Sequence, residues 1–345
     1  MSILLERACS IYIIAVSQGR KAQTPWGQPS VDQPSKPRRA AFAPLDNPVR
    51  LLEWPYAPLN WVMALAAIAL ALAGLDLGYA LAGSVSGYLF DIAAYGAETI
   101  FAGGLIGLVI VWIRSIEGRP LATAGFRPAD AQTIWLMVAL AGLWVFSSNA
   151  LGMIYDPEFR PLGTPDRATA LTIAALEPWP LWLHALAVSI FAIAIVTGAV
   201  AEEVVYRAWA LSSLTPAIGL GAAAIISSLL FAWSHVSIAE LTGLAPVLSL
   251  VDYFFSGLLF CLLALRAGIG AASVFHTANN MLISVVDFID GGGDIRYVFE
   301  QWAQPRANDD PVQAAAGLAL TLAVLGFVYV TLPRQGWDLT AAQAR

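Results

Sequence analysis

The feature that most constrains this chain is a series of long apolar blocks. A helix needs about 20 mostly apolar residues to cross the hydrocarbon core of a bilayer. Because lipid cannot satisfy backbone polar groups, only helices and closed barrels span it, and blocks this long and rich in Ala and Leu indicate helices. The sequence therefore predicts an all-α polytopic membrane bundle of about eight transmembrane helices. The expected spans are residues 59–83, 93–113, 131–151, 181–204, 217–237, 246–266, 269–289 and 312–332.

The composition supports a membrane protein. Hydrophobic residues make up 58% of the 345 residues, and only 12% are charged. The charged fraction is about half that of an ordinary soluble protein. The net charge of −6 is spread over the loops and no basic patch with aromatic residues is present, so we expect no nucleic-acid partner.

The distribution of charge predicts the orientation. Residues 1–58, rich in Pro from position 23 onward, are expected to form a flexible cytoplasmic tail, followed by the transmembrane bundle at 59–335. With the N-terminus inside, only four of the 18 Lys and Arg residues fall in outward loops: Arg160, Arg167, Arg296 and Arg306. Cytoplasmic loops carry the excess of basic residues in membrane proteins. Both termini are therefore expected in the cytoplasm.

The first polar cluster in an apolar block is the sequence AEEVVYR at residues 201–207. A charge at the bilayer centre costs about 2.5–3.5 kcal/mol, so it requires a partner or a function. Glu203 and Arg207 are four residues apart and are expected to pair on one helix face. Glu202 then points about 100° away from that pair. A partly desolvated carboxylate of this kind is suited to act as a general base. The alternative interpretation is a charge cluster that ends the helix and fixes the topology.

Two more polar motifs lie in later blocks. FAWSH, residues 231–235, places His235 in the fifth expected span, and HTANN, residues 276–280, places His276 and Asn280 on one face of the seventh. The alternative for each is a side chain that packs or hydrogen-bonds between helices. The remaining histidine, His184, lies about 27 Å along the helix from Glu202 and is interpreted as an interfacial residue.

The expected depths of these groups differ. The inner ends of the three helices are expected near Ser213, Gly219 and Gly268. A rise of 1.5 Å per residue then places Glu202, His235 and His276 at depths of about 17, 24 and 12 Å. Straight, upright helices do not bring these side chains to one level. Helix tilts of about 20° or a shifted helix end are required for a common site.

Together the three motifs resemble the CPBP family of intramembrane endopeptidases, which includes the type II CAAX prenyl proteases and the bacteriocin-processing and Abi-like proteins. The family pattern is EExxxR, FxxxH and HxxxN or HxxxD. Here it is matched by Glu202-Glu203-x-x-x-Arg207, Phe231-x-x-x-His235 and His276-x-x-x-Asn280. The resemblance covers a peptidase-like core at about residues 180–290.

The resemblance implies an intramembrane endopeptidase that cleaves a membrane-associated protein or peptide, in contact with membrane lipid, in the inner (plasma) membrane of a bacterium. Glu202 and His235 would activate a water, and His276 and Asn280 would stabilise the oxyanion. Glu203, Arg207 and Phe231 would support the site. The family is often described as a metalloprotease, but we expect no metal. If zinc binds, its ligands would be Glu202, His235 and His276.

Two other functions compete with this hypothesis. The first is a non-catalytic scaffold or sorting protein on the same fold. The second is a transporter, suggested by further acids in apolar blocks: Asp76, Glu98, Asp252 and Asp287. Neither internal symmetry nor the paired broken helices typical of many transporters is evident in the sequence.

Overall fold

The computed structural model describes residues 89–127, 129–155, 180–236, 241–303 and 311–332. All regular structure within these ranges is helical, which confirms the all-α membrane bundle. Six helices there are long and apolar enough to cross a membrane. The expected first span at 59–83 and the expected tail at 1–58 lie outside the described residues.

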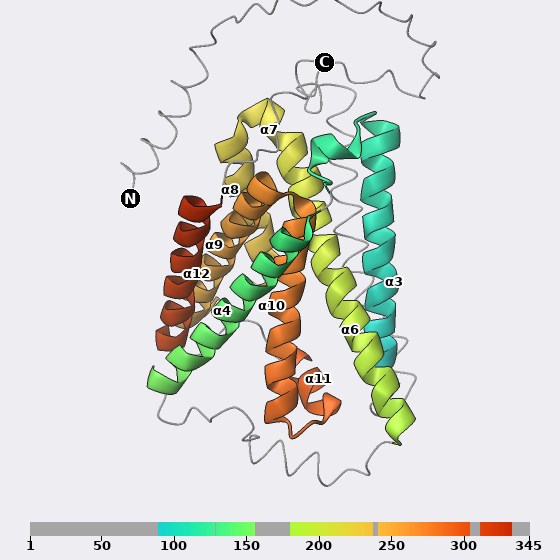
Figure 1. Ribbon diagram of the computed structural model, residues 1–345, viewed down its shortest axis with the longest axis vertical. Coiled ribbons are helices and arrows are strands. Elements are labelled where there is room, and N and C mark those ends of the chain that lie inside the picture. The colour runs from blue at the N-terminus through green and yellow to red at the C-terminus, as the bar shows by residue number, and fades with distance from the viewer. Residues whose placement is uncertain (1–88, 128, 156–179, 237–240, 304–310, 333–345) are drawn as a thin grey trace, which may run out of the picture. The chain divides into compact units, whose positions relative to one another are not determined.

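In chain order the long helices alternate in direction through the bundle when the short helix Leu220–Trp233 is counted (Figure 1). They are α3 (Leu89–Val111), α4 (Ala131–Tyr155), α6 (Leu181–Glu203), α9 (Leu244–Ala267), α10 (Ile269–Asp290) and α12 (Pro311–Thr331). The shorter elements are the π-helix η2 (Trp112–Ile116), the 3-10 helix η3 (Leu121–Ala124), the π-helix η4 (Val204–Leu211), α7 (Ser212–Ile218), α8 (Leu220–Trp233) and α11 (Ile295–Ala303). The most extensive contacts join α9 to α12, α10 to α4 and α3 to α6.

The fourth expected span is longer than predicted. Helical structure continues from α6 through η4 and α7 to Ile218, beyond both the end of the apolar block at residue 204 and the inner helix end expected near Ser213. No glycine interrupts residues 199–218, and the path ends at Gly219, whose φ of 81° lies in the left-handed region that glycine adopts without steric cost. The polar residues at 202–207 therefore lie within the helix rather than at its end.

The fifth expected span, 217–237, is wrong in length. Its helix, α8, has only 14 residues, which gives a length of about 21 Å against the roughly 30 Å of a hydrocarbon core. The helix ends at Trp233, where Ser234 and His235 interrupt the apolar run. Of the seven expected spans that fall within the described residues, six are therefore long helices and this one is a short apolar helix.

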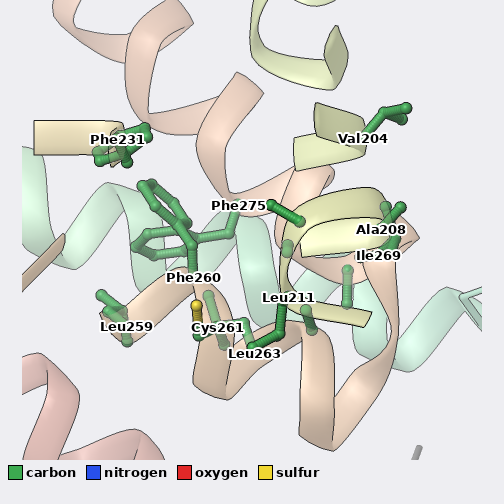
Figure 2. Packing of buried hydrophobic residues seen from close by; sticks show 14 of the residues in the cluster. Val204, Ala208, Leu211, Phe231, Leu259, Phe260, Cys261, Leu263, Ile269 and Phe275 are labelled. Carbon is green, nitrogen blue, oxygen red and sulfur yellow. The ribbon is translucent and has the colours of Figure 1, made fainter. Parts of the chain in front are cut away.

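The main hydrophobic core lies between η4, α8, α9 and α10 and extends to α4 and α12. Figure 2 shows Phe231, Phe260 and Phe275 packed at its centre. The helices α8 and α9 approach closely at Gly257, where a Cβ atom would lie 2.9 Å from the Cα of Ser228. Small residues permit such contacts between membrane helices. The core therefore holds these four elements in fixed register around the polar motifs.

A second core lies at the opposite end of α6 and α10, where α11 packs. Its buried members are Ala187, Phe191, Ile195, Ile295, Val298 and Phe299. In the turn before α11, Asp294 forms an ion pair with the buried Arg296. Burial raises the pKa of the Asp294 carboxyl, but hydrogen bonds from Arg296 outweigh it, and the pKa lies below its ordinary value. This end of the bundle is thus a separate packing unit from the motif region.

Candidate active site

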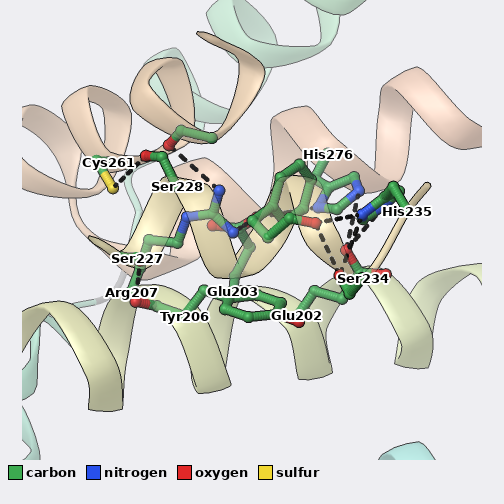
Figure 3. Close-up of polar contacts among 12 residues, drawn as sticks. Glu202, Glu203, Tyr206, Arg207, Ser227, Ser228, Ser234, His235, Cys261 and His276 are labelled. Atoms are coloured by element: carbon green, nitrogen blue, oxygen red, sulfur yellow. Dashed lines mark hydrogen bonds and ion pairs between the residues drawn. The ribbon is translucent and has the colours of Figure 1, made fainter. Parts of the chain in front are cut away.

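The polar motifs converge from four elements of the bundle, α6, η4, α8 and α10 (Figure 3). Glu202 and Glu203 end α6, and Arg207 lies in η4. His235 directly follows the end of α8, and His276 lies in the second turn of α10. The side chains meet in one cluster, so the tertiary structure brings together groups that are up to 74 residues apart in sequence.

The hairpin between α7 and α8 explains how Glu202 and His235 reach one level. Glu202 lies 17 residues before the turn at Gly219, and His235 lies 16 residues after it. At about 1.5 Å per residue these paths have nearly equal length, since the helix ends at Ile218 rather than near Ser213. His276 is closer to its own turn, and Figure 1 shows the α9–α10 turn deeper in the bundle than α7. The expected mismatch in depth is therefore removed by shifted helix ends.

Glu203 is the centre of a fully buried ion-paired group. Its Oε1 atom lies 3.3 Å from Arg207 Nη1 and accepts a hydrogen bond of 2.9 Å from His276 Nδ1. The Arg207 guanidinium lies over the rings of Phe231 and Phe260, 4.5 and 4.9 Å from their centroids. The predicted pairing of Glu203 with Arg207 is confirmed, and the same carboxylate also holds His276.

The Arg207 guanidinium is further fixed by α9. Its Nη2 atom donates a hydrogen bond of 3.2 Å to the carbonyl of Gly257, the glycine at the close contact with α8. A buried charge is stabilised only where partners replace its hydration. The carboxylate, the carbonyl and the two aromatic rings supply those partners, so Arg207 is a structural cation within the bundle.

Both site histidines have their orientation set at Nδ1. His276 Nδ1 donates to Glu203, and His235 Nδ1 donates to the Phe231 carbonyl at 2.8 Å. Each Nε2 atom then faces Glu202, with distances to Glu202 Oε2 of 3.6 Å from His235 and 4.0 Å from His276. Aromatic rings support the arrangement, because His276 stacks on Phe260 and His235 packs against Tyr253.

The two adjacent glutamates differ in their surroundings. The Glu202 side chain is 30% exposed, whereas that of Glu203 is fully buried. Hydrogen bonds between such groups have lengths near 2.7–3.2 Å, so the separations of 3.6 and 4.0 Å around Glu202 are longer than direct hydrogen bonds. Glu202 is therefore the less buried of the two glutamates, and its Oε2 atom is faced by two imidazole nitrogens.

Comparison with known proteins agrees with this geometry. Residues 182–282 match the family described as type II CAAX prenyl endopeptidase Rce1-like. This core belongs to the CPBP family. The matched segment begins in the first turn of α6 and ends in α10, so it contains all three motifs. No curated protein and no solved structure matches the chain.

Not every predicted site residue of the CPBP core has a contact with this cluster. Asn280 lies one turn after His276 on α10 and is half-buried, but among the described residues no side-chain hydrogen bond joins it to Glu202, His235 or His276. His184 lies in the first turn of α6 beside Phe288, far from Glu202, as its interpretation as an interfacial residue requires. The role predicted for Asn280 stays a prediction.

Four residues near the CPBP motifs were not singled out in the sequence. Tyr206 and Ser234 lie inside two of the motifs, and the signal for Tyr206 was its position one turn after Glu202. Phe260 and Tyr253 lie on α9, which carries no motif. An aromatic residue in an apolar span gives no sequence signal of its own, so only the packing of α9 against α8 and α10 identifies them.

Zinc can accept two imidazoles and a carboxylate as ligands, with bonds of about 2.0–2.2 Å. The described residues, however, contain no group of three or more His, Cys, Asp and Glu side chains arranged to hold a metal ion. Imidazole and carboxylate groups are thus suitable zinc ligands, but these side chains are not arranged as a metal site in this structure. Metal independence therefore stays a prediction.

The prediction is tested by chelation. Purified protein dialysed against EDTA and 1,10-phenanthroline is expected to keep its peptidase activity to within about twofold, since the carboxylate base needs no metal to accept a proton. Activity and metal content by mass spectrometry are measured before and after dialysis. Loss of activity that added Zn²⁺ restores would contradict the prediction and assign Glu202, His235 and His276 as ligands.

Proposed function

We propose that this protein is an intramembrane endopeptidase that hydrolyses a peptide bond in a membrane-associated protein or peptide. The observation that supports the proposal best is the position of Glu202: its Oε2 atom is faced by His235 and His276, while the neighbouring Glu203 is buried in an ion pair. A general base must be accessible and lie close to the proton that it removes. Within the cluster, Glu202 is the partly exposed carboxylate, and its Oε2 atom lies 3.6 and 4.0 Å from the Nε2 atoms of the two histidines.

In the proposed reaction Glu202 removes a proton from a water whose second proton points to His235 Nε2. The water oxygen attacks the carbonyl carbon of the scissile peptide bond, and the negative charge moves to the carbonyl oxygen. Breaking the C–N bond then releases the amine, which takes the proton held by Glu202. These reaction steps need one group that first accepts a proton as a base and then donates it as an acid, and a carboxylate can fill both roles.

Stabilisation of the oxyanion is assigned to His276 and Asn280. His276 would donate from Nε2 in its doubly protonated form, in which its Nδ1–H also hydrogen-bonds the Glu203 carboxylate. The Asn280 amide is a donor in every protonation state. We also propose, from the distribution of basic residues, that both termini are cytoplasmic and that the protein resides in a bacterial inner membrane.

The experiment is comparative proteomics of membrane extracts from cells that express wild type, Glu202→Ala or Asp287→Asn. We expect at least one membrane-associated precursor to accumulate with Glu202→Ala and to be processed normally with Asp287→Asn. Asp287 is a suitable control because, like Glu202, it is a carboxylate within an apolar helix. It lies on α10, 11 residues or about 16 Å beyond His276.

Each alternative function predicts a different result. If wild type and Glu202→Ala process the same proteins equally, the catalytic assignment is wrong and a scaffold or sorting role takes its place. If Asp287→Asn instead abolishes proton- or ion-coupled flux in proteoliposomes, the protein is a transporter.

A further inference from the structure

A short hydrogen-bond chain leads from η4 to the far side of the His235 ring (Figure 3). The Tyr206 hydroxyl hydrogen-bonds the Ser234 side chain. Ser234 Oγ donates to the Phe231 carbonyl at 2.8 Å and lies 3.2 Å from His235 Nδ1. The single hydroxyl proton of Ser234 is directed to the Phe231 carbonyl. The Ser234 oxygen therefore accepts a hydrogen bond from the Tyr206 hydroxyl.

The Phe231 carbonyl receives two donors in this arrangement. Both Ser234 Oγ and His235 Nδ1 lie 2.8 Å from it. A carbonyl oxygen has two lone pairs and can accept both. Nδ1 therefore carries a proton, and the other nitrogen, Nε2, is the one that faces Glu202 at 3.6 Å.

Tyr206 is itself held in place independently of this chain. Its backbone carbonyl accepts a hydrogen bond of 2.6 Å from Ser227 Oγ on α8, and its ring packs edge-on against Phe231. Tyr206 also lies four residues after Glu202, on the same side of the helical path. It thus links the element that carries the proposed base to the residue that orients the facing histidine.

We propose that Tyr206 and Ser234 are positioning residues that hold His235 with Nδ1 protonated and Nε2 directed at Glu202. The inference rests on the proposed hydrolysis at Glu202, for which it supplies the orientation of the water. Partners of this kind set the tautomer and ring orientation of functional histidines, and their removal typically costs 10–100-fold in activity. Neither residue contacts the substrate in this proposal.

A purely structural role predicts different behaviour. Ser234 also caps the C-terminus of α8, where its hydroxyl satisfies a helix carbonyl. If capping were its only function, Ser234→Ala would lower the stability of the protein without altering the tautomer of His235 or the turnover of the folded enzyme.

The test uses the full-length protein in detergent with Tyr206→Phe, Ser234→Ala and the double variant. Each single variant is expected to lower kcat about 10-fold with KM changed less than about twofold. The double variant is expected to lose little more than the larger single effect, because both act through one chain of contacts. Ser234→Thr, which keeps the hydroxyl, is expected to restore most of kcat.

Matched controls remove the same groups elsewhere. Tyr95→Phe alters a tyrosine of the second core, and Ser189→Ala removes a hydroxyl that donates to a carbonyl of its own helix. Both controls are expected to keep wild-type kcat. An equal loss in the controls would mean that any such hydroxyl supports the fold, and would overturn the proposal.

A second readout does not depend on activity. The chain has only three histidines, so the ¹⁵N spectrum of histidine-labelled protein resolves the tautomer of each. Wild type is expected to show His235 protonated at Nδ1, with the Nε2-protonated form increased in Tyr206→Phe and Ser234→Ala. An unchanged tautomer overturns the positioning role even if kcat falls. If Glu202→Gln keeps full activity, the hydrolytic mechanism fails while the spectra still decide whether Tyr206 and Ser234 orient His235.

Discussion

Glu202→Gln is expected to lower kcat for peptide cleavage about 10³-fold or more, because an amide cannot accept the proton of the attacking water. Gln has nearly the same size and remains polar, and the Glu202 side chain is 30% exposed. The change therefore leaves packing and the buried ion pair of Glu203 intact. Purified variants are compared with a substrate identified by proteomics, under conditions that give kcat and KM separately.

The control for this prediction is Asp252→Asn. Asp252 is another carboxylate within the bundle, but its Oδ2 atom lies beside α12, 3.6 Å from where a Cβ of Gly317 would be. Its amide variant is expected to keep kcat to within about threefold, the size of an ordinary packing effect. Retention of more than about a tenth of wild-type kcat by Glu202→Gln would show that another group activates the water.

Arg207→Met is expected to destabilise the folded protein by about 3–5 kcal/mol, because it leaves the Glu203 carboxylate buried without its cation. Both side chains are fully buried, and Glu203 Oε2 and Arg207 Nε already lack a hydrogen-bond partner among the described residues. Because the site is buried, water cannot replace the lost Arg207 charge beside Glu203. Chemical unfolding of the detergent-solubilised protein measures the change in free energy.

The double variant Glu203→Gln with Arg207→Met separates stability from function. Replacing both members of a buried ion pair is often close to neutral, so stability is expected to return to within about 1 kcal/mol of wild type. The kcat is expected to stay at least about 10-fold low, since an amide at position 203 weakens the hydrogen bond that orients His276 at Nδ1. Full recovery of kcat would show that the ion pair serves folding alone.

The fold class and the motif residues could both be predicted from the sequence. Long apolar blocks predict membrane helices because lipid offers no other way to satisfy the backbone. The same environment makes each buried charge costly, so Glu203 and Arg207 stand out, and their spacing alone predicts the pair that the structure contains.

The lengths of two helices were not predictable from hydropathy alone. The polar cluster at 202–207 suggested an end near residue 204, but the charges are satisfied by α8, α9 and α10, so the helical path continues to Ile218. In the next segment the apolar run exceeds the helix that forms, because α8 ends where Ser234 and His235 turn toward the site. Hydropathy measures the free-energy cost of placing a side chain in lipid. It contains no information about the side chain on another helix that pairs with it.

Apolar block length by itself determined that this chain forms a membrane helical bundle, and the spacing of its polar residues selected Glu202, Glu203, Arg207, His235 and His276. Only the tertiary structure decided that these groups meet, because their common level depends on where helices end and on the close contact at Gly257. Helix packing also places Glu203 against His276 and leaves the Glu202 side chain 30% exposed. The physical reason is that burial and hydrogen-bond partners depend on neighbouring helices, which are distant in sequence.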